Sequence, residues 1–164
     1  MIDSPMSFWT FSLSFYAEPA VKKACLELQE RFGADVNLVL FMLYQAGLGR
    51  QLNALEIKRI DQTVYPWRSG VIQQIRSARN NLKQPNEHLT TDEVREFKSQ
   101  LMATELQAEK LQQSMLETLE IEWLPAAPKI AAHANLEAYA QLINANKQDI
   151  AGLLEAFGHK YQLS

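Results

Sequence analysis

The residues of this chain that could do chemistry are arginines and carboxylates on two neighbouring predicted helices. From Arg50 to Lys83 there are seven basic residues and two acidic ones. From Glu87 to Glu122 there are nine acidic residues and three basic ones. The short loop between these segments predicts an antiparallel helical hairpin. A basic arm would then lie against an acidic arm.

The apolar stripes of the two arms indicate how they pair. Folding the chain about residue 87 brings Ile75 opposite Phe97 and Arg68 opposite Glu105. At 100° per residue, Glu105 falls inside the apolar stripe of its helix, with Glu109 beside it. An unpaired buried charge costs several kcal/mol, so Glu105 needs a partner. The register favours Arg68, whose guanidinium suits a bidentate contact.

These side chains and the polar start of a central helix form one candidate polar cluster or ligand-binding site. Two interpretations of it stay open, besides a third in which the long side chains simply extend into solvent. In the first interpretation, the cluster is a structural ion-pair network that fixes the hairpin. In the second, its surplus basic groups, together with Lys83, line a pocket for an anionic ligand or partner. The candidate residues are Asp35, Asn37, Arg68, Arg76, Arg79, Glu105 and Glu109.

No short catalytic motif is present. The sequence has no Gly-rich phosphate loop, no HExxH, no GxSxG and no paired acidic motif for Mg²⁺. The one cysteine, Cys25, permits no intrachain disulfide and is expected in the core. His133 and His159 do not have metal-ligand spacing. We predict no catalytic residue, metal site or cofactor, and leave enzymatic activity open because all-α enzymes often lack short motifs.

The segment that positions Asp35 and Asn37 is apolar on every side. Read as a helix over about residues 35–48, it has Asp35 as its N-cap, and Gly47 and Gly49 end it. A helix that is apolar all round is buried, and this one is too short to cross a bilayer. Asn37 is then a polar side chain in a helix without a solvent-exposed face.

Apolar positions recur at helical spacing along most of the chain, and no convincing strand is found. We predict an all-α fold: a single domain of residues 1–164, with seven or eight helices around the central helix and a long helix over about 91–121. The expected boundaries are a first helix from Ser4 or Ser7, a second from Pro19 to Gly33, N-caps at Asn53, Thr90 and Asn135, a break or kink at Pro66, and a last helix ending at Gly158.

Two apolar clusters each have a structural and a functional interpretation. The first, on the N-terminal helix, is favoured as core but would mark an interaction surface if exposed. The second, at the end of the long helix, needs cover from the C-terminal helices or from a second subunit. The first consists of Phe8, Trp9, Phe11, Phe15 and Tyr16, and the second of Met115, Leu116, Leu119, Ile121 and Trp123.

The bulk composition is that of an ordinary globular protein. The chain has 164 residues, 47% of them hydrophobic and 21% charged, and a net charge of -3. This charge argues against a general polyanion binder. No signal peptide and no membrane-spanning run is visible, so we expect a cytoplasmic location.

Several runs resemble a family of small, uncharacterised, all-helical proteobacterial proteins that share a domain of unknown function. The similarity is spread over roughly residues 8–123, and Ala20 departs from the glycine expected after Pro19. The resemblance implies no activity. It picks out Asp35, Asn37, Arg68, Arg79, Glu105 and Glu109. The matching runs are Phe8-Trp9-Thr-Phe11-Ser12-Leu, Gly33-Ala-Asp35-Val36-Asn37-Leu38, Pro66-Trp67-Arg68 and Glu105-Leu106-Gln-Ala108-Glu109.

We expect a non-catalytic protein that acts through protein–protein binding, with another protein or with a second copy of itself. The first alternative is an anionic small molecule held by Arg68, Arg76 and Arg79, with Glu105 or Glu109 as acid or base if the site is enzymatic. The second is RNA or ribosome contact through the basic helix at 66–83, which would weaken steeply with salt. Nucleic acid ranks last because the basic residues are half turned toward the core.

Overall fold

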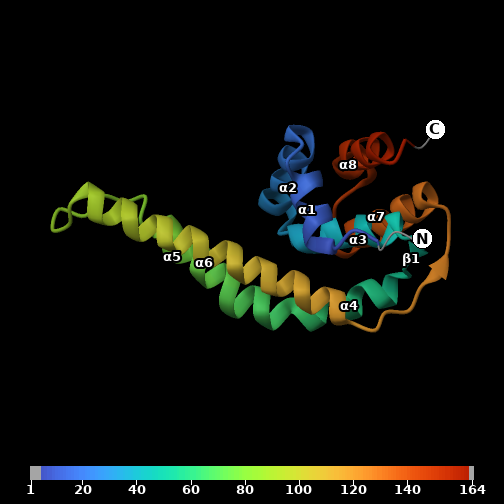
Figure 1. The fold of residues 1–164 in the computed structure, drawn as a ribbon, viewed down its shortest axis with the longest axis horizontal. Coiled ribbons are helices and arrows are strands. Elements are labelled where there is room, and N and C mark those ends of the chain that lie inside the picture. Colours follow the sequence, from blue (N-terminus) through green and yellow to red (C-terminus); the bar gives the residue numbers. More distant parts are fainter. Residues whose placement is uncertain (1–4, 163–164) are drawn as a thin grey trace.

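Helices form nearly all the regular structure of residues 5–162, the part of the chain that this computed structural model describes. In that range there are eight α-helices, one π-helical turn and a two-stranded sheet, which confirms the all-α fold class (Figure 1). The elements are α1 (Phe8–Tyr16), α2 (Pro19–Phe32), α3 (Val36–Gly47), β1 (Arg50–Gln51), α4 (Ala54–Trp67), η1 (Arg68–Ile72), α5 (Gln73–Asn81), α6 (Thr91–Thr118), β2 (Leu124–Pro125), α7 (Pro128–Leu142) and α8 (Lys147–Lys160).

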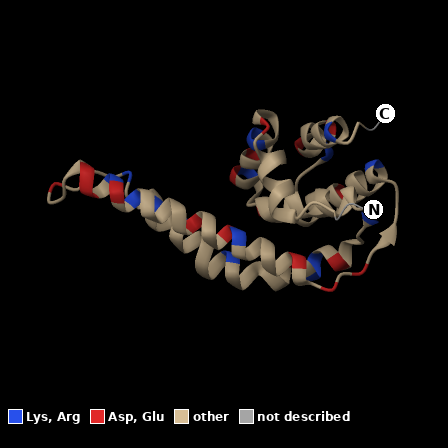
Figure 2. Ribbon diagram, in the orientation of Figure 1, with Lys and Arg blue, Asp and Glu red and all other residues tan. Residues whose placement is uncertain are grey.

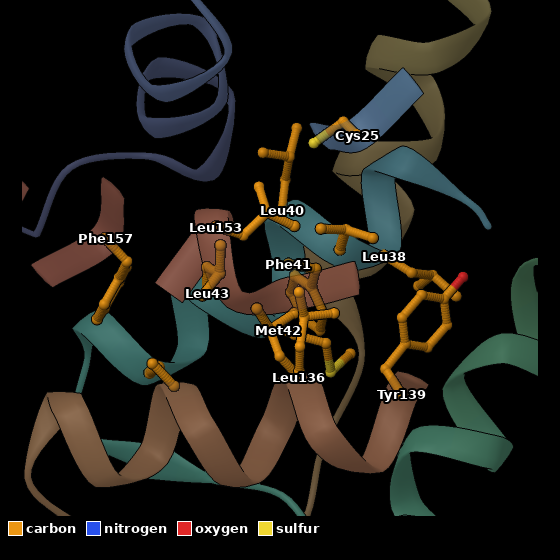
Figure 3. Close-up of a cluster of buried hydrophobic side chains, with 14 of the residues drawn as sticks. Cys25, Leu38, Leu40, Phe41, Met42, Leu43, Leu136, Tyr139, Leu153 and Phe157 are labelled. Atoms are coloured by element: carbon orange, nitrogen blue, oxygen red, sulfur yellow. The ribbon is translucent and has the colours of Figure 1, made fainter. Parts of the chain in front are cut away.

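The central helix α3 is buried as its sequence predicts. Nine of its twelve residues are buried, and α7 packs along it. Phe41 and Leu43 meet side chains such as Leu136 and Leu153 in one core (Figure 3). Fully burying a side chain of this size contributes about 1.5–3 kcal/mol, so this contact fixes α3 in place. The start of α3, with Asp35 as its N-cap, is therefore a rigid base for polar groups.

The helical hairpin forms a long arm that extends away from this core. α4, η1 and α5 follow one another along one side of the arm, and α6 runs back beside them (Figure 1). None of the α5 residues is buried. Phe97, expected to face Ile75 in the interior, is 53% exposed. The outer end of the arm is thus a two-helix structure that cannot cover an aromatic ring on all sides.

The irregularity expected at Pro66 occurs just after it. Helix α4 continues through Pro66 to Trp67, and the π-helical turn η1 follows. There the backbone N–H of Gln73 donates to the carbonyl of Arg68, five residues earlier. A π-turn holds more residues than an α-turn, so it rotates the side chains around it from the positions that 100° per residue predicts.

Most predicted helix starts are confirmed, and some ends are not. Ser7 caps α1, Asn53 caps α4, and Thr90 with Glu93 forms a reciprocal capping box on α6; Ser4 lies outside the described residues. The predicted cap at Asn135 is wrong, because α7 begins seven residues earlier at Pro128. Helix α6 ends at Thr118 rather than near 121, and α8 continues past Gly158 to Lys160.

The small sheet was not expected from the sequence. Arg50 pairs with Pro125 and Gln51 with Leu124 in an antiparallel bridge. Two residues a strand are too few to show an alternating pattern. Within residues 5–162, no helix has both the length and the apolar content needed to cross a membrane.

Both apolar clusters are largely accounted for within the chain. Phe8, Phe11 and Phe15 are buried, which confirms them as core, whereas Trp9 and Tyr16 are half-buried. At the end of α6, Leu116 is buried, and Met115, Leu119 and Ile121 pack against the core. Trp123 stays 44% exposed, with the guanidinium of Arg50 5.0 Å from its ring centre.

Candidate functional site

A cleft of about 700 Å³ lies between the arm and the N-terminal helices. Helices α1 and α2 line one side, α6 and the η1–α5 segment line the other, and the start of α3 closes its inner end. All seven residues of the predicted polar cluster contribute to its lining. Sequence reasoning therefore placed these residues together, although it did not find the cleft itself.

Asp35 is the centre of the innermost polar contacts. Its Oδ1 accepts from the backbone N–H of Asn37 at 2.9 Å, as an N-cap does. Its Oδ2 accepts from Gln112 Nε2 at 2.6 Å and from Arg68 Nη1 at 3.0 Å. The backbone N–H of Asp35 donates to the hydroxyl of Tyr139 at 2.8 Å. The carboxylate is buried, and these donors compensate for its lost hydration.

Arg68 has different partners from the one predicted. Its Nη1 donates to Asp35 and, at 2.9 Å, to Asp61 Oδ1 instead of pairing with Glu105. The predicted register assumed a regular α-helix, but Arg68 begins the π-turn η1. The changed phase of that turn directs its side chain toward the start of α3. The arginine therefore joins the arm to the central helix and not to α6.

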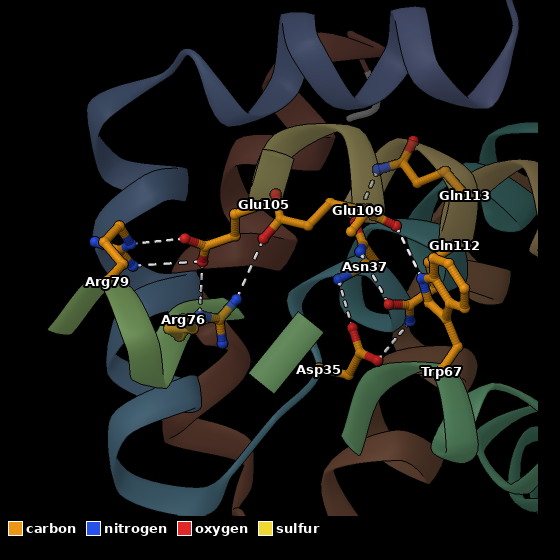
Figure 4. A network of polar contacts seen from close by, with 10 residues as sticks. Asp35, Asn37, Trp67, Arg76, Arg79, Glu105, Glu109, Gln112 and Gln113 are labelled. Atoms are coloured by element: carbon orange, nitrogen blue, oxygen red, sulfur yellow. Dashed lines mark hydrogen bonds and ion pairs between the residues drawn. The ribbon is translucent and has the colours of Figure 1, made fainter. Parts of the chain in front are cut away.

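Glu105 is held by the two other arginines of the cluster (Figure 4). Arg76 Nε donates to its Oε1 at 2.9 Å, and Arg79 Nε donates to its Oε2 at 2.6 Å. Arg76 also reaches Glu109 Oε1 at 3.2 Å. Figure 2 shows the basic and acidic residues side by side along the middle of the arm. A bidentate, partly buried arrangement of this kind fixes the pairing of α5 with α6.

Burial sets the protonation behaviour of Glu109, Tyr16 and Cys25. It raises the pKa of Glu109 above the ordinary 4.5, and Arg76 only partly opposes that change. Burial, and then the neighbouring Cys25 and Glu109, raise the pKa of Tyr16. Cys25 is fully buried, and burial raises the pKa of its thiol to about 12, which rules out a reactive thiolate at neutral pH.

Glu109→Gln is expected to change how stability depends on pH. Because the folded-state pKa of Glu109 is raised, ionisation costs stability as pH increases from about 4.5 through that pKa. The wild type should therefore lose stability relative to the variant over this range, by at most about 1.4 kcal/mol per pH unit. Urea unfolding between pH 4 and 7 measures the difference. Glu96→Gln, on the exposed face of the same helix, should show no such trend.

The border of the cleft is apolar and exposed. Leu13 of α1, Leu26 of α2 and Leu106 of α6 all line it, and they are 54%, 38% and 52% exposed. We call these three residues the leucine rim. The sequence gives little sign of it, because each leucine lies outside the inward stripe of its own helix. Their common location appears only when three helices are placed together.

The cleft therefore presents an apolar border and a floor of paired charges. Arg68, Arg76 and Arg79 each contact a carboxylate. The predicted basic pocket required arginines that are not paired within the protein, so these three do not form it. Among the described residues, no group of three His, Cys, Asp or Glu side chains is placed to hold a metal ion. The arrangement offers shape and fixed hydrogen-bonding groups.

Comparison with known families identifies the chain. Residues 7–116 match the model of a family described as a protein of unknown function, DUF2390. The chain belongs to the DUF2390 family. The resemblance to an uncharacterised all-helical family is thereby confirmed. No curated protein and no solved structure matches the chain significantly.

The matched segment contains the whole cleft of this DUF2390 protein. Its lining runs from Trp9 to Gln113, inside residues 7–116. A second cavity of about 710 Å³ is lined by residues between Lys129 and Gln162 on α7, α8 and the chain that follows, outside the match. The cleft thus belongs to the domain that defines the family, and we take it as the candidate site.

Proposed function

We propose that this DUF2390 protein is a cytoplasmic, non-catalytic binding protein whose cleft receives one amphipathic helix of a partner protein. The observation that carries the proposal is the leucine rim, three half-exposed leucines from three helices around one cleft. Exposed apolar side chains that gather at one place mark interaction surfaces, whereas scattered ones need no explanation. A helix laid between two helical walls is a common mode of peptide recognition.

The size of the cleft favours a single helix over a second copy of the arm. An α-helix with its side chains is about 10–12 Å wide, and the arm consists of two such helices packed together. A volume of about 700 Å³ holds the anchoring side chains of one helix but not a hairpin. The exposed apolar residues at the outer end of the arm, such as Phe97 and Met102, are therefore a poor fit to the cleft of a second copy.

A small polar molecule is the second candidate, since cavities of about 300–1,000 Å³ commonly bind such ligands. An anion is the less favoured kind, because it would have to displace Glu105 from Arg76 and Arg79. RNA contact is favoured least. It needs free basic groups on the arm, and the arginines of its cleft side are already engaged with carboxylates.

Substituting the leucine rim tests the proposal. A photo-crosslinking residue at position 106 should capture a discrete protein in the native cell, and the same residue at position 55 should not. Leu55 is the matched control because it is 81% exposed and lies outside the cleft. The captured protein is then titrated with purified chain. Leu13→Ser, Leu26→Ser and Leu106→Ser together should weaken the affinity by at least about tenfold, since fully burying one leucine side chain contributes about 1.5–3 kcal/mol.

Three results would count against the partner helix. Capture of the chain by itself would point to a second copy. Equal capture from positions 55 and 106 would show that the rim is not special. Unchanged affinity of the triple variant, with an unchanged thermal unfolding temperature, would place the interface elsewhere on the molecule.

A further inference from the structure

A chain of side-chain amides crosses the inner end of the cleft from Asp35 to α6. Gln112 Nε2 donates to the Asp35 carboxylate, and Asn37 Nδ2 donates to Gln112 Oε1 at 3.4 Å. Gln113 Nε2 then donates to Asn37 Oδ1 at 2.9 Å. A carboxylate only accepts, so it fixes the direction of every bond behind it. Because every hydrogen bond in this series has a fixed direction, the side-chain carbonyl oxygen of Gln113 is left at its end without a donor.

That oxygen is buried and has no hydrogen-bond partner among the described residues. Figure 4 shows it directed away from Asn37, toward the dark blue ribbon of α1. Ser12 Oγ on α1 is the other buried side-chain oxygen without a partner in the described part of the chain. Both residues are 4% exposed, and both line the cleft. An unsatisfied buried polar atom costs about 1–3 kcal/mol, so two at one site need a reason.

The packing of α1 on α6 places these two oxygens at the same level. The two helices are antiparallel here, because the backbone N–H of Phe8 donates to Glu117 while Tyr16 interacts electrostatically with Glu109. Ser12 lies midway between Phe8 and Tyr16, and Gln113 lies midway between Glu117 and Glu109. By this register Ser12 and Gln113 lie at the same level where α1 packs on α6, and each brings one buried oxygen without a hydrogen-bond partner.

We propose that Ser12 and Gln113 form a binding site for a neutral primary amide. The Ser12 hydroxyl would donate to the amide oxygen, and Gln113 Oε1 would accept from the amide N–H. A carboxylate has no proton to donate, so it could not form a hydrogen bond with the Gln113 oxygen. An ammonium group only donates, so it would leave the proton of the Ser12 hydroxyl without an acceptor. The amide is the side chain of asparagine or glutamine on the proposed partner helix, or a free small amide.

Nuclear magnetic resonance titration of the full-length, ¹⁵N-labelled chain with propionamide tests the site. Propionamide should shift the side-chain NH₂ signals of Gln113 and the backbone signal of Ser12 in a saturable way, and sodium propionate and propylammonium chloride should not. Ser12→Ala should weaken propionamide binding about two- to tenfold, the value of one neutral hydrogen bond. Ser114→Ala, an exposed serine beside Gln113, should leave it unchanged.

The free protein provides a second readout. A buried hydroxyl without a partner costs stability, so Ser12→Ala should keep or raise the thermal unfolding temperature. A lowered temperature would show that the Ser12 hydroxyl is satisfied by Gln113 or by a fixed water. That result, or the absence of propionamide shifts at Gln113, would overturn the amide site.

The amide site depends on the proposed function only in one respect, namely that the partner helix would supply the amide. The amide site and the partner helix can therefore be refuted separately. Propionamide binding with no capture at position 106 would leave a small amide as the ligand. The opposite result is capture at position 106 that Ser12→Ala and Gln113→Met do not reduce, together with no propionamide shifts. That result would support the partner helix and refute the amide site. If both experiments succeed, Ser12→Ala should also weaken the affinity of the protein for the captured partner.

Discussion

Asp35→Ala is expected to lower the free energy of unfolding by about 3–5 kcal/mol, the cost of removing one member of a buried ion pair. The substitution removes the N-cap of α3 and leaves the guanidinium of Arg68 and the amide of Gln112 without their buried acceptor. Since Gln112 is fully buried, solvent cannot replace that contact. Urea unfolding followed by circular dichroism at pH 7 measures the loss.

Two matched substitutions separate the contributions to this loss. Asp35→Asn retains a capping oxygen and removes the charge, so it should cost less than alanine. Asp61→Asn removes the other, more exposed partner of Arg68 and should cost about 1 kcal/mol or less. If Asp61→Asn proved as destabilising as Asp35→Ala, the buried contacts at the start of α3 would not be the important ones.

Asn135→Ala is expected to cost about 3 kcal/mol, because it leaves several buried backbone groups unpaired. Asn135 is fully buried within α7. Its Oδ1 accepts from the backbone N–H of Leu52 at 2.8 Å, and its Nδ2 donates to the carbonyls of Met42 and Arg50. One side chain thus connects α7 to α3 and to the strand β1.

Thermal and urea unfolding of Asn135→Ala measure this effect, with Gln141→Ala as the control on an exposed position of the same helix. The control should change stability by less than about 0.5 kcal/mol. A similarly small effect at Asn135 would mean that the three backbone groups find other partners after the side chain is removed.

The predictable part of the fold depended on local patterns. The core position of α3 follows from apolar residues on all of its sides, and its start follows from Asp35, because capping is decided within a few residues. Thr90 with Glu93 gave the start of α6 for the same reason. The grouping of Glu105 with arginines followed from matching two apolar stripes across one short loop.

The parts that could not be predicted depend on contacts between distant segments. Asn135 has the sequence appearance of an N-cap, and only its contacts to Leu52 and Met42 show that it is an internal core residue. The partners of Arg68 depended on a π-turn that no sequence pattern announced. The roles of Ser12 and Gln113 required the register of α1 on α6, which joins residues about a hundred positions apart.

The shared use of α6 gives the molecule a mechanical property. This helix is one wall of the cleft near its middle, and it also extends to the end of the arm. Its 28 residues span about 42 Å, so a rotation of about 10° at one end moves the other end by about 7 Å. Any rotation of α6 about its core end would therefore be magnified at the outer end of the arm. A fluorescent label at Phe97, which is 53% exposed, would test by energy transfer whether occupancy of the cleft rotates α6.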